Sequence, residues 1–96
     1  YAMTLNAGSA GITGSLVTAG TGAALLTVDI NESGSTILST KLTFDATETT
    51  TTSAAVPVVI SDTALAADSI ITIDVDTLDT GLVAAGLKIS LIGSVT

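Results

Sequence analysis

Apolar and polar residues alternate along most of the chain, and a repeat of two is the repeat of a β-strand. Five segments show the alternation clearly, with Val, Ile and Leu on one parity and Thr, Ser, Asp or Lys mostly on the other. They are residues 26–30, 38–44, 56–60, 71–75 and 87–91, and weaker versions occupy residues 1–5 and 12–16. Because no segment carries an extended apolar stripe at helical spacing, the pattern favours strands throughout.

The residues between these segments have the composition of turns. Asn-Glu-Ser-Gly-Ser at 31–35 predicts a hairpin loop in which Gly34 adopts a positive φ. The Thr-rich stretch 45–53 predicts an extended connection, part of which can pair at a strand edge. Residues 62–68 predict a loop or one helical turn capped by Asp62. Strands separated by turns every ~8–12 residues indicate a single all-β domain over residues 1–96, an antiparallel β-sandwich of jelly-roll or Ig-like type with about seven to eight short strands.

The same alternation divides the aliphatic residues into an inward and an outward set. The inward set forms the expected core: Leu26, Val28, Ile30, Leu38, Leu42, Phe44, Val58, Ile60, Ile71, Ile73, Val75, Leu87, Ile89 and Leu91. Four large aliphatics have the outward parity of their strands, namely Ile37, Val59, Ile70 and Ile92. Since a small domain gains little by exposing them, we expect these four to lie at an interface between subunits.

Composition restricts the chemistry that the chain can perform. It contains no His, Cys, Trp or Arg, and its polar residues are dominated by 18 Thr and 10 Ser. Thiol nucleophiles, Cys or His metal sites, Ser-His-Asp triads, imidazole proton shuttles and arginine phosphate clamps are therefore impossible within the chain. We expect a protein that is not an enzyme and that needs no cofactor.

Charge restricts the partners. Nine acidic residues and two lysines, Lys41 and Lys88, give a net charge of -7. Nucleic acid and anionic membrane surfaces would repel such a chain, and its apolar runs, such as Val58–Ile60, are too short to span a bilayer. The sequence contains no pattern of a signal peptide. Tyr1 is a native start, a tag remnant or the boundary of an excerpt.

The acidic residues are the remaining candidates for a site. Asp74 and Asp76 share the outward face of one strand and Asp79 follows it, so the three could bind Ca²⁺ weakly. The spacing does not fit an EF-hand loop. The alternative is a solvated face whose like charges deter pairing at a strand edge. The spacing of Asp74 and Asp76 fits an inverting glycosidase pair on distance alone, but such a site needs an aromatic-lined cleft, and a chain with one Tyr and one Phe disfavours it.

Two further motifs are weaker. Asn31-Glu32-Ser33 matches the N-glycosylation pattern, which also arises by chance. Gly20-Thr21-Gly22 lacks the following lysine and helix of a phosphate-binding loop.

Residues 23–93 resemble a recurrent domain of tailed-phage virion proteins, often described as tail-fibre or minor structural proteins. The resemblance is carried, in order, by four strings: Leu26-Thr27-Val28-Asp29-Ile30-Asn31-Glu32-Ser33-Gly34 with Thr36-Ile37-Leu38-Ser39-Thr40-Lys41-Leu42-Thr43, then Pro57-Val58-Val59-Ile60-Ser61-Asp62, then Ile71-Thr72-Ile73-Asp74-Val75-Asp76, and finally Gly86-Leu87-Lys88-Ile89-Ser90-Leu91-Ile92-Gly93. The chain departs from the pattern at residues 79–85, where relatives tend to be Gly-rich and this chain has Leu82-Val83-Ala84-Ala85. We expect this departure to alter a loop at an oligomer contact.

The resemblance implies a β-sandwich of the virion exterior, such as a tail fibre, head fibre or decoration protein. It implies a homotrimer whose partners are other virion proteins and a host surface glycan. Two alternatives remain open at this point. One is a secreted, extracellular glycan-binding module with a Ca²⁺-assisted site, and the other is a scaffold repeat of a surface assembly.

Overall fold

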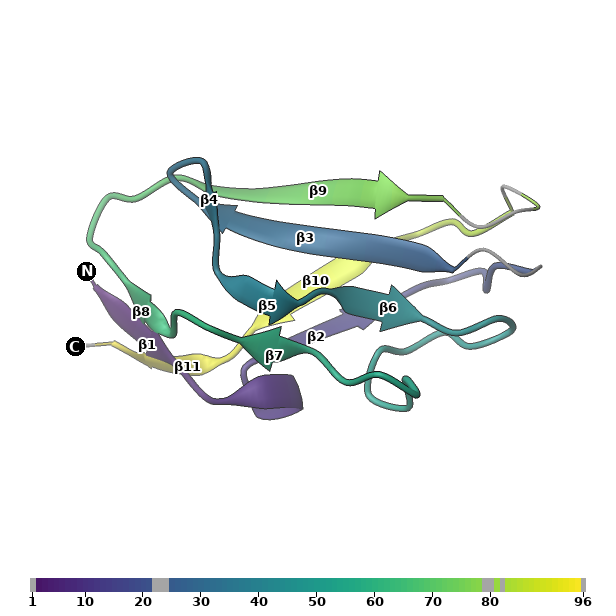
Figure 1. Cartoon of the computed structure of the whole chain (residues 1–96), viewed down its shortest axis with the longest axis horizontal. Coiled ribbons are helices and arrows are strands. Elements are labelled where there is room, and N and C mark those ends of the chain that lie inside the picture. Colours follow the sequence, from purple (N-terminus) through teal and green to yellow (C-terminus); the bar gives the residue numbers. More distant parts are fainter. Residues whose placement is uncertain (1, 22–24, 79–80, 82, 96) are drawn as a thin grey trace.

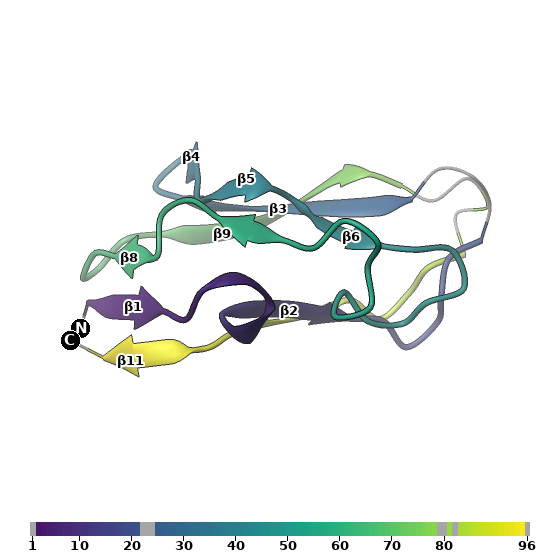
Figure 2. The same ribbon diagram turned by 60° about the horizontal axis from the view of Figure 1, so that its bottom comes forward.

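Strand pairing arranges the chain in two antiparallel layers, as the computed structural model shows (Figures 1 and 2). It describes residues 2–21, 25–78, 81 and 83–95. Within them the strands are β1 (Met3–Leu5), β2 (Ile12–Ser15), β3 (Leu26–Glu32), β4 (Ser35–Thr36), β5 (Leu38–Thr40), β6 (Leu42–Phe44), β7 (Val59–Ile60), β8 (Ala64–Leu65), β9 (Ile71–Thr77), β10 (Lys88–Leu91) and β11 (Gly93–Val95). One short 3₁₀ turn, η1 (Gly8–Ala10), separates β1 from β2.

One layer is built around the N-terminal strands. β1 pairs with β11 on one side and with β8 on the other, and β2 pairs with β10. The other layer is built around β3, which pairs with β4, β6 and β9, and a short β5–β7 ladder accompanies it. The two termini meet at one end of the molecule, where Met3 lies opposite Val95 (Figure 1). The molecule is elongated along the strands, with extents of 40 × 22 × 22 Å.

The fold class expected from the alternation is therefore confirmed: the chain is all-β, with antiparallel sheets in a sandwich-like arrangement. The strands are shorter and more numerous than the expected seven to eight, because several of them are interrupted. The single alternating segment 38–44 becomes β5 and β6, and the β5–β7 ladder changes register between Leu38 and Thr40. A hydrophobic pattern continues across such an irregularity, so it does not reveal the break.

The hairpin between β3 and β4 is confirmed. Ser33 and Gly34 both have positive φ, 49° and 89°, which is the backbone of a tight type I′ turn. Residues 62–68 were expected to form a loop or one helical turn: the helical turn is wrong, and the segment is a loop interrupted by β8. The Asp62 carboxylate accepts a hydrogen bond from the Ala64 N–H at 3.1 Å, and the next residues form β8 because Leu65 is buried in the core.

The core lies between the layers, and most of the inward set is in it. Val28, Ile30, Leu42 and Phe44 are buried, whereas Ile60, Ile71, Leu87, Ile89 and Leu91 are partly buried against them. The expected burial is wrong for two residues of this set, since Ile73 and Val75 are 49% and 45% exposed. They stand on the inner face of β9, opposite Ile30 and Val28 of β3, but β9 is an edge strand that the other layer does not fully cover.

The Thr-rich connection does more than join two strands. Thr51 is buried, its hydroxyl accepts a hydrogen bond from the Gly14 N–H at 2.9 Å, and its own N–H donates to the Gly14 carbonyl at 3.1 Å. Ser15 and Thr50 form an isolated antiparallel bridge beside this contact. The expectation that part of this stretch pairs at a strand edge is confirmed, and its threonine at position 51 secures it to β2.

Replacing Phe44 by Ala should destabilise the domain by about 3–5 kcal/mol, because a fully enclosed ring leaves a cavity. Its ring also fills the space that glycine leaves at position 14, where an added Cβ would lie 2.8 Å from the Phe44 Cζ. Urea melts measure the change. Val56→Ala, at an exposed site, should change the stability by less than about 0.5 kcal/mol. A loss below about 1 kcal/mol for Phe44→Ala would contradict the packing.

Replacing Thr51 by Val should cost about 1–3 kcal/mol, because the shape is kept but the buried Gly14 N–H loses its acceptor. Thr52→Val, on the exposed neighbouring residue, is the matched control and should have little effect. Equal stabilities of the two variants in thermal or urea melts would show that the hydroxyl at position 51 is not needed.

Candidate functional site

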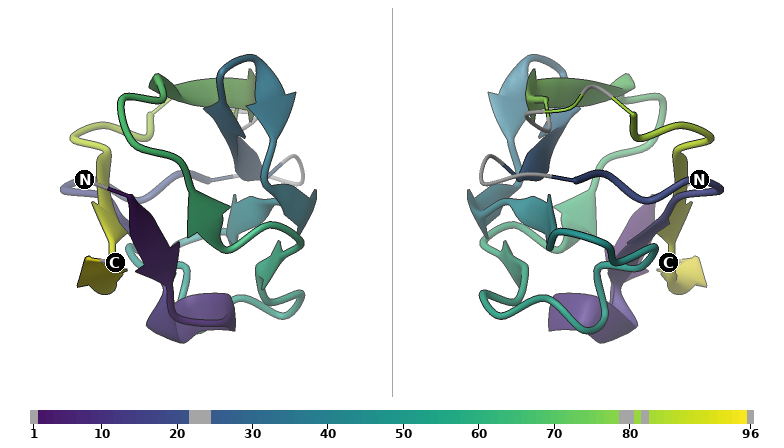
Figure 3. Two further views of the ribbon diagram at one scale, coloured as in Figure 1. Left: turned by 90° about the vertical axis from the view of Figure 1, so that its left-hand side faces the viewer. Right: turned by 90° about the vertical axis from the view of Figure 1, so that its right-hand side faces the viewer.

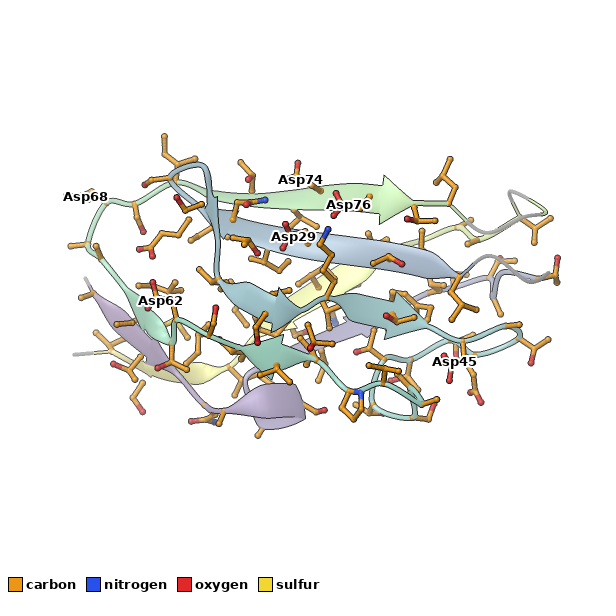
Figure 4. All side chains as sticks on the ribbon, in the orientation of Figure 1. Asp29, Asp45, Asp62, Asp68, Asp74 and Asp76 are labelled. Carbon is orange, nitrogen blue, oxygen red and sulfur yellow. The ribbon has the colours of Figure 1, made fainter. Side chains whose placement is uncertain are left out.

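Acidic side chains gather on the outer face of the β3–β9 pair (Figure 4). Asp29 of β3 lies directly opposite Asp74 of β9, and Asp76 follows on the same strand. The inner face of β3 is filled by Val28 and Ile30, so the alternation of the strand puts Asp29 on the outside. The other labelled aspartates, such as Asp45 and Asp62, lie away from this face.

Each of these three carboxylates has a partner within the chain. Asp29, which is nearly buried, accepts a hydrogen bond from the Thr36 hydroxyl at 2.5 Å. Asp74 accepts one from the Asn31 side-chain amide at 2.6 Å. Asp76 forms an ion pair with Lys41. The face is therefore a row of satisfied polar groups.

The neighbouring carboxylates change the pKa of Lys41. Its hydrogen bond to Asp76, together with the negative charges of Asp76 and Asp29, raises the pKa of Lys41 above its ordinary value of 10.5 despite some desolvation. Lys41 is consequently protonated at every physiological pH. The pair is exposed, so it orients the Asp76 carboxylate more than it stabilises the fold.

The calcium hypothesis gains no support from this geometry. Asp74 and Asp76 do lie on the same outer face, while Asp79 is outside the described residues. Within residues 2–21, 25–78, 81 and 83–95, no three acidic side chains are placed so that they could hold a metal ion. That part of the chain also encloses no pocket, and it has no helix long and apolar enough to cross a membrane.

Of the four residues expected at a subunit interface, one is buried and three are exposed. Ile37 is only 1% exposed, so it belongs to the core, and its expected place at an interface is wrong. The chain bends between β4 and β5, where the Thr36 hydroxyl accepts the Leu38 N–H at 3.1 Å, and Ile37 and Leu38 both turn inward. Val59, Ile70 and Ile92 are exposed, as their parity predicts; Ile70 is 70% and Ile92 44% exposed.

The alternation of apolar and polar residues along the sequence did not reveal the exposed aliphatic residues of β9, an edge strand of the sandwich. Ile73 and Val75 were expected in the core, yet they add to the exposed apolar surface near Ile70, and Leu78 follows them. The signal that would have found them is position in the sheet: β9 pairs with β3 alone among the described strands. An edge strand can have an inner face that its own chain leaves partly bare.

Comparison with protein-family models, curated proteins and solved structures gives no match for this chain.

Calcium should leave the melting temperature unchanged at millimolar concentration. A ligand of the native state would raise it by mass action, but the Asp74 and Asp76 carboxylates are already held by Asn31 and Lys41. Differential scanning fluorimetry with Ca²⁺ and with Mg²⁺ as the control measures this. A Ca²⁺-specific rise that disappears when Asp74, Asp76 and Asp79 are all changed to Asn would contradict the prediction.

Proposed function

We propose that this chain is a non-enzymatic structural and adhesion component of a tailed-phage virion, assembled as a homotrimer on the exterior of the particle. A tail fibre, a head fibre and a decoration protein all fit this description. Its partners are copies of itself, other virion proteins and a glycan of the host surface. The resemblance of residues 23–93 supports the virion assignment.

The observation that carries the proposal is the exposure of large aliphatic residues on a chain of this size. Ile70, Ile73, Val75 and Ile92 are all between 44% and 70% exposed. Full burial of such a side chain contributes roughly 1.5–3 kcal/mol, so their partial burial in a contact still favours association. At physiological salt the repulsion between chains of charge -7 is screened beyond about 8 Å. Assembly is therefore favoured over a lone chain.

The surface chemistry supports an architectural role. Charged residues make up only 11% of the chain, and the outer face of the β3–β9 pair is occupied by hydroxyl, amide and carboxylate groups that bond to one another. Such a surface suits a component that is held rigidly in an assembly. Neighbouring head or tail genes around the gene for this chain would support the virion role. Neighbouring secreted hydrolases would favour a glycan-binding module instead.

Light scattering of the purified domain at micromolar concentration should give a mass about three times its 9.4 kDa. Ile92→Asp should convert it to the monomer, because a carboxylate cannot be buried unpaired in the contact. Val56→Asp, at an exposed residue outside β9 and β10, is the matched control and should leave the mass unchanged. Circular dichroism verifies that both variants keep the fold. A 9.4 kDa species for the unaltered chain would overturn the trimer.

A further inference from the structure

We propose that the free edge of β9 pairs with the free edge of β10 from a second copy of this chain, antiparallel, with Ile73 opposite Leu91 and Asp76 opposite Lys88. The proposal rests on the self-association named in the proposed function, and it is independent of the virion role. It specifies which surfaces meet, in which direction and in which register.

Both strands have an unused edge in the described part of the chain. β9 bonds only to β3, and β10 bonds only to β2. β9 is seven residues long, one of the two longest strands described. An unpaired edge of that length presents a row of free N–H and C=O groups, which another strand can bind. Figure 3 shows β9 along the top of the molecule, with the yellow C-terminal strand on one flank and teal segments on the other.

The proposed register matches side chains on both faces of the joined strands. On the inner face, Ile73 meets Leu91, and Val75 meets Ile89. On the outer face, Asp74 meets the Ser90 hydroxyl. Asp76, which lies at the register shift between β3 and β9, meets the Lys88 ammonium group while it keeps its ion pair with Lys41, because a carboxylate accepts from more than one donor. Aliphatic and opposite-charge pairs directly across two antiparallel strands are the pairs that stabilise a sheet. A shift of one residue would place aliphatic residues of one strand beside polar residues of the other.

The backbone of β9 agrees with this register. The Ser33 N–H donates to the Ile70 carbonyl at 2.8 Å, so Ile70 directs its polar groups toward β3. Successive residues of a strand direct these groups to opposite sides. Ile71, Ile73 and Val75 therefore direct their N–H and C=O groups to the free edge.

The backbone of β10 agrees as well. Ile92 donates its N–H to the Gly11 carbonyl at 2.7 Å and accepts from the Asn6 N–H at 3.0 Å, so both its groups face the β1–β2 side. By the same alternation, Leu91 and Ile89 direct theirs outward. The residues with free backbone groups on β10 are thus the ones that the register places opposite Ile73 and Val75.

Two exposed isoleucines, Ile70 and Ile92, lie at one end of this contact. The register continues to Thr72 opposite Ile92, which makes Ile70 a diagonal neighbour of Ile92 on the same face. Two exposed isoleucines, at 70% and 44%, would therefore meet on the outer side. The contact has an apolar end and, at Asp76 and Lys88, a charged end.

The proposed contact is head-to-tail, because it joins two different surfaces, β9 of one copy and β10 of the next. β9 and β10 run in opposite directions within one chain (Figure 1). Rotation about an axis along the strands keeps β9 of one copy antiparallel to β10 of the next, and every copy has one edge of each kind. Such a heterologous contact closes into a ring when the rotation allows it. Pairing of β9 with a second β9 about a two-fold axis would instead bring Asp74 and Asp76 against like charges.

A cysteine pair tests the register directly, because the chain has no cysteine of its own. Asp74→Cys combined with Ser90→Cys places two thiols directly opposite each other across the contact. Under mild oxidation we expect a covalent trimer on a non-reducing gel. Thr72→Cys with Ser90→Cys is the matched control: its thiols are diagonal, about 7–8 Å apart and beyond disulfide reach, so it should not form the trimer. Either single variant can give a dimer at most.

The other results overturn the proposal in distinguishable ways. A cross-link at the mass of one chain would show that β9 and β10 pair within the same molecule. A trimer by light scattering that does not cross-link in the double variant would reject this edge contact while leaving the proposed assembly intact. A monomer under all conditions would reject both.

Lys88 provides a second, independent test. Lys88→Glu should weaken the trimer about tenfold, since each contact loses an attraction and gains a like-charge repulsion. Thr52→Glu combined with Val56→Glu is the matched control, because it changes the net charge by the same amount at two exposed residues outside β9 and β10, and it should leave the trimer as strong as before. Equal weakening by both variants, or none by Lys88→Glu, would contradict the Asp76–Lys88 contact.

Discussion

The structure depends on the burial of the inner face of β3. Val28 and Ile30 are completely enclosed, and β3 is the strand on which β4, β6 and β9 are assembled. Its outer face carries Asp29 and Asn31, whose side chains bond to Thr36 and Asp74. One strand thus supplies the apolar wall of the core on one side and organises the polar network on the other. A one-residue shift in its register would reverse both faces at once.

The same strand explains the open side of the sandwich. β9 adds to the edge of β3 and copies its alternation, with Ile73 and Val75 beside Ile30 and Val28. The layer built on β1 and β2 covers β3 but does not enclose β9 completely, so the inner face of the added strand stays half exposed. Small domains bury a smaller fraction of their surface than large ones. In the proposed assembly, another copy of the chain buries the remaining aliphatic surface.

The sequence predicted those features that depend on local alternation and turn chemistry. The strand character of the segments, the Ser33–Gly34 hairpin and the burial of Phe44 follow from parity and from the φ that glycine permits. It did not predict the burial of Ile37, because parity assumes an unbroken strand and the chain bends beside Thr36. It did not predict the exposure of Ile73 and Val75, because parity identifies the face of a strand but not what covers it. For the candidate site, it predicted that Asp74 and Asp76 share a face, but not that Asn31 and Lys41, distant in sequence, already bind them.

In the proposed edge contact, charge determines which strands can pair with β9. Backbone hydrogen bonds and aliphatic contact attract a strand of almost any sequence, which makes a long free edge a site of uncontrolled aggregation. Asp74 and Asp76 stand beside the free edge of β9, on the face that a joining strand would extend. They disfavour a second β9, or any acidic strand, by direct repulsion at short range, where salt screens it least.

A strand that alternates aliphatic residues with hydroxyl and basic residues meets no such penalty. Residues 88–91, Lys-Ile-Ser-Leu, fit that description, and in the described part of the chain the strand that they form, β10, pairs with β2 alone. In the proposed edge contact, Asp74 and Asp76 are therefore the groups that determine which strand can join β9.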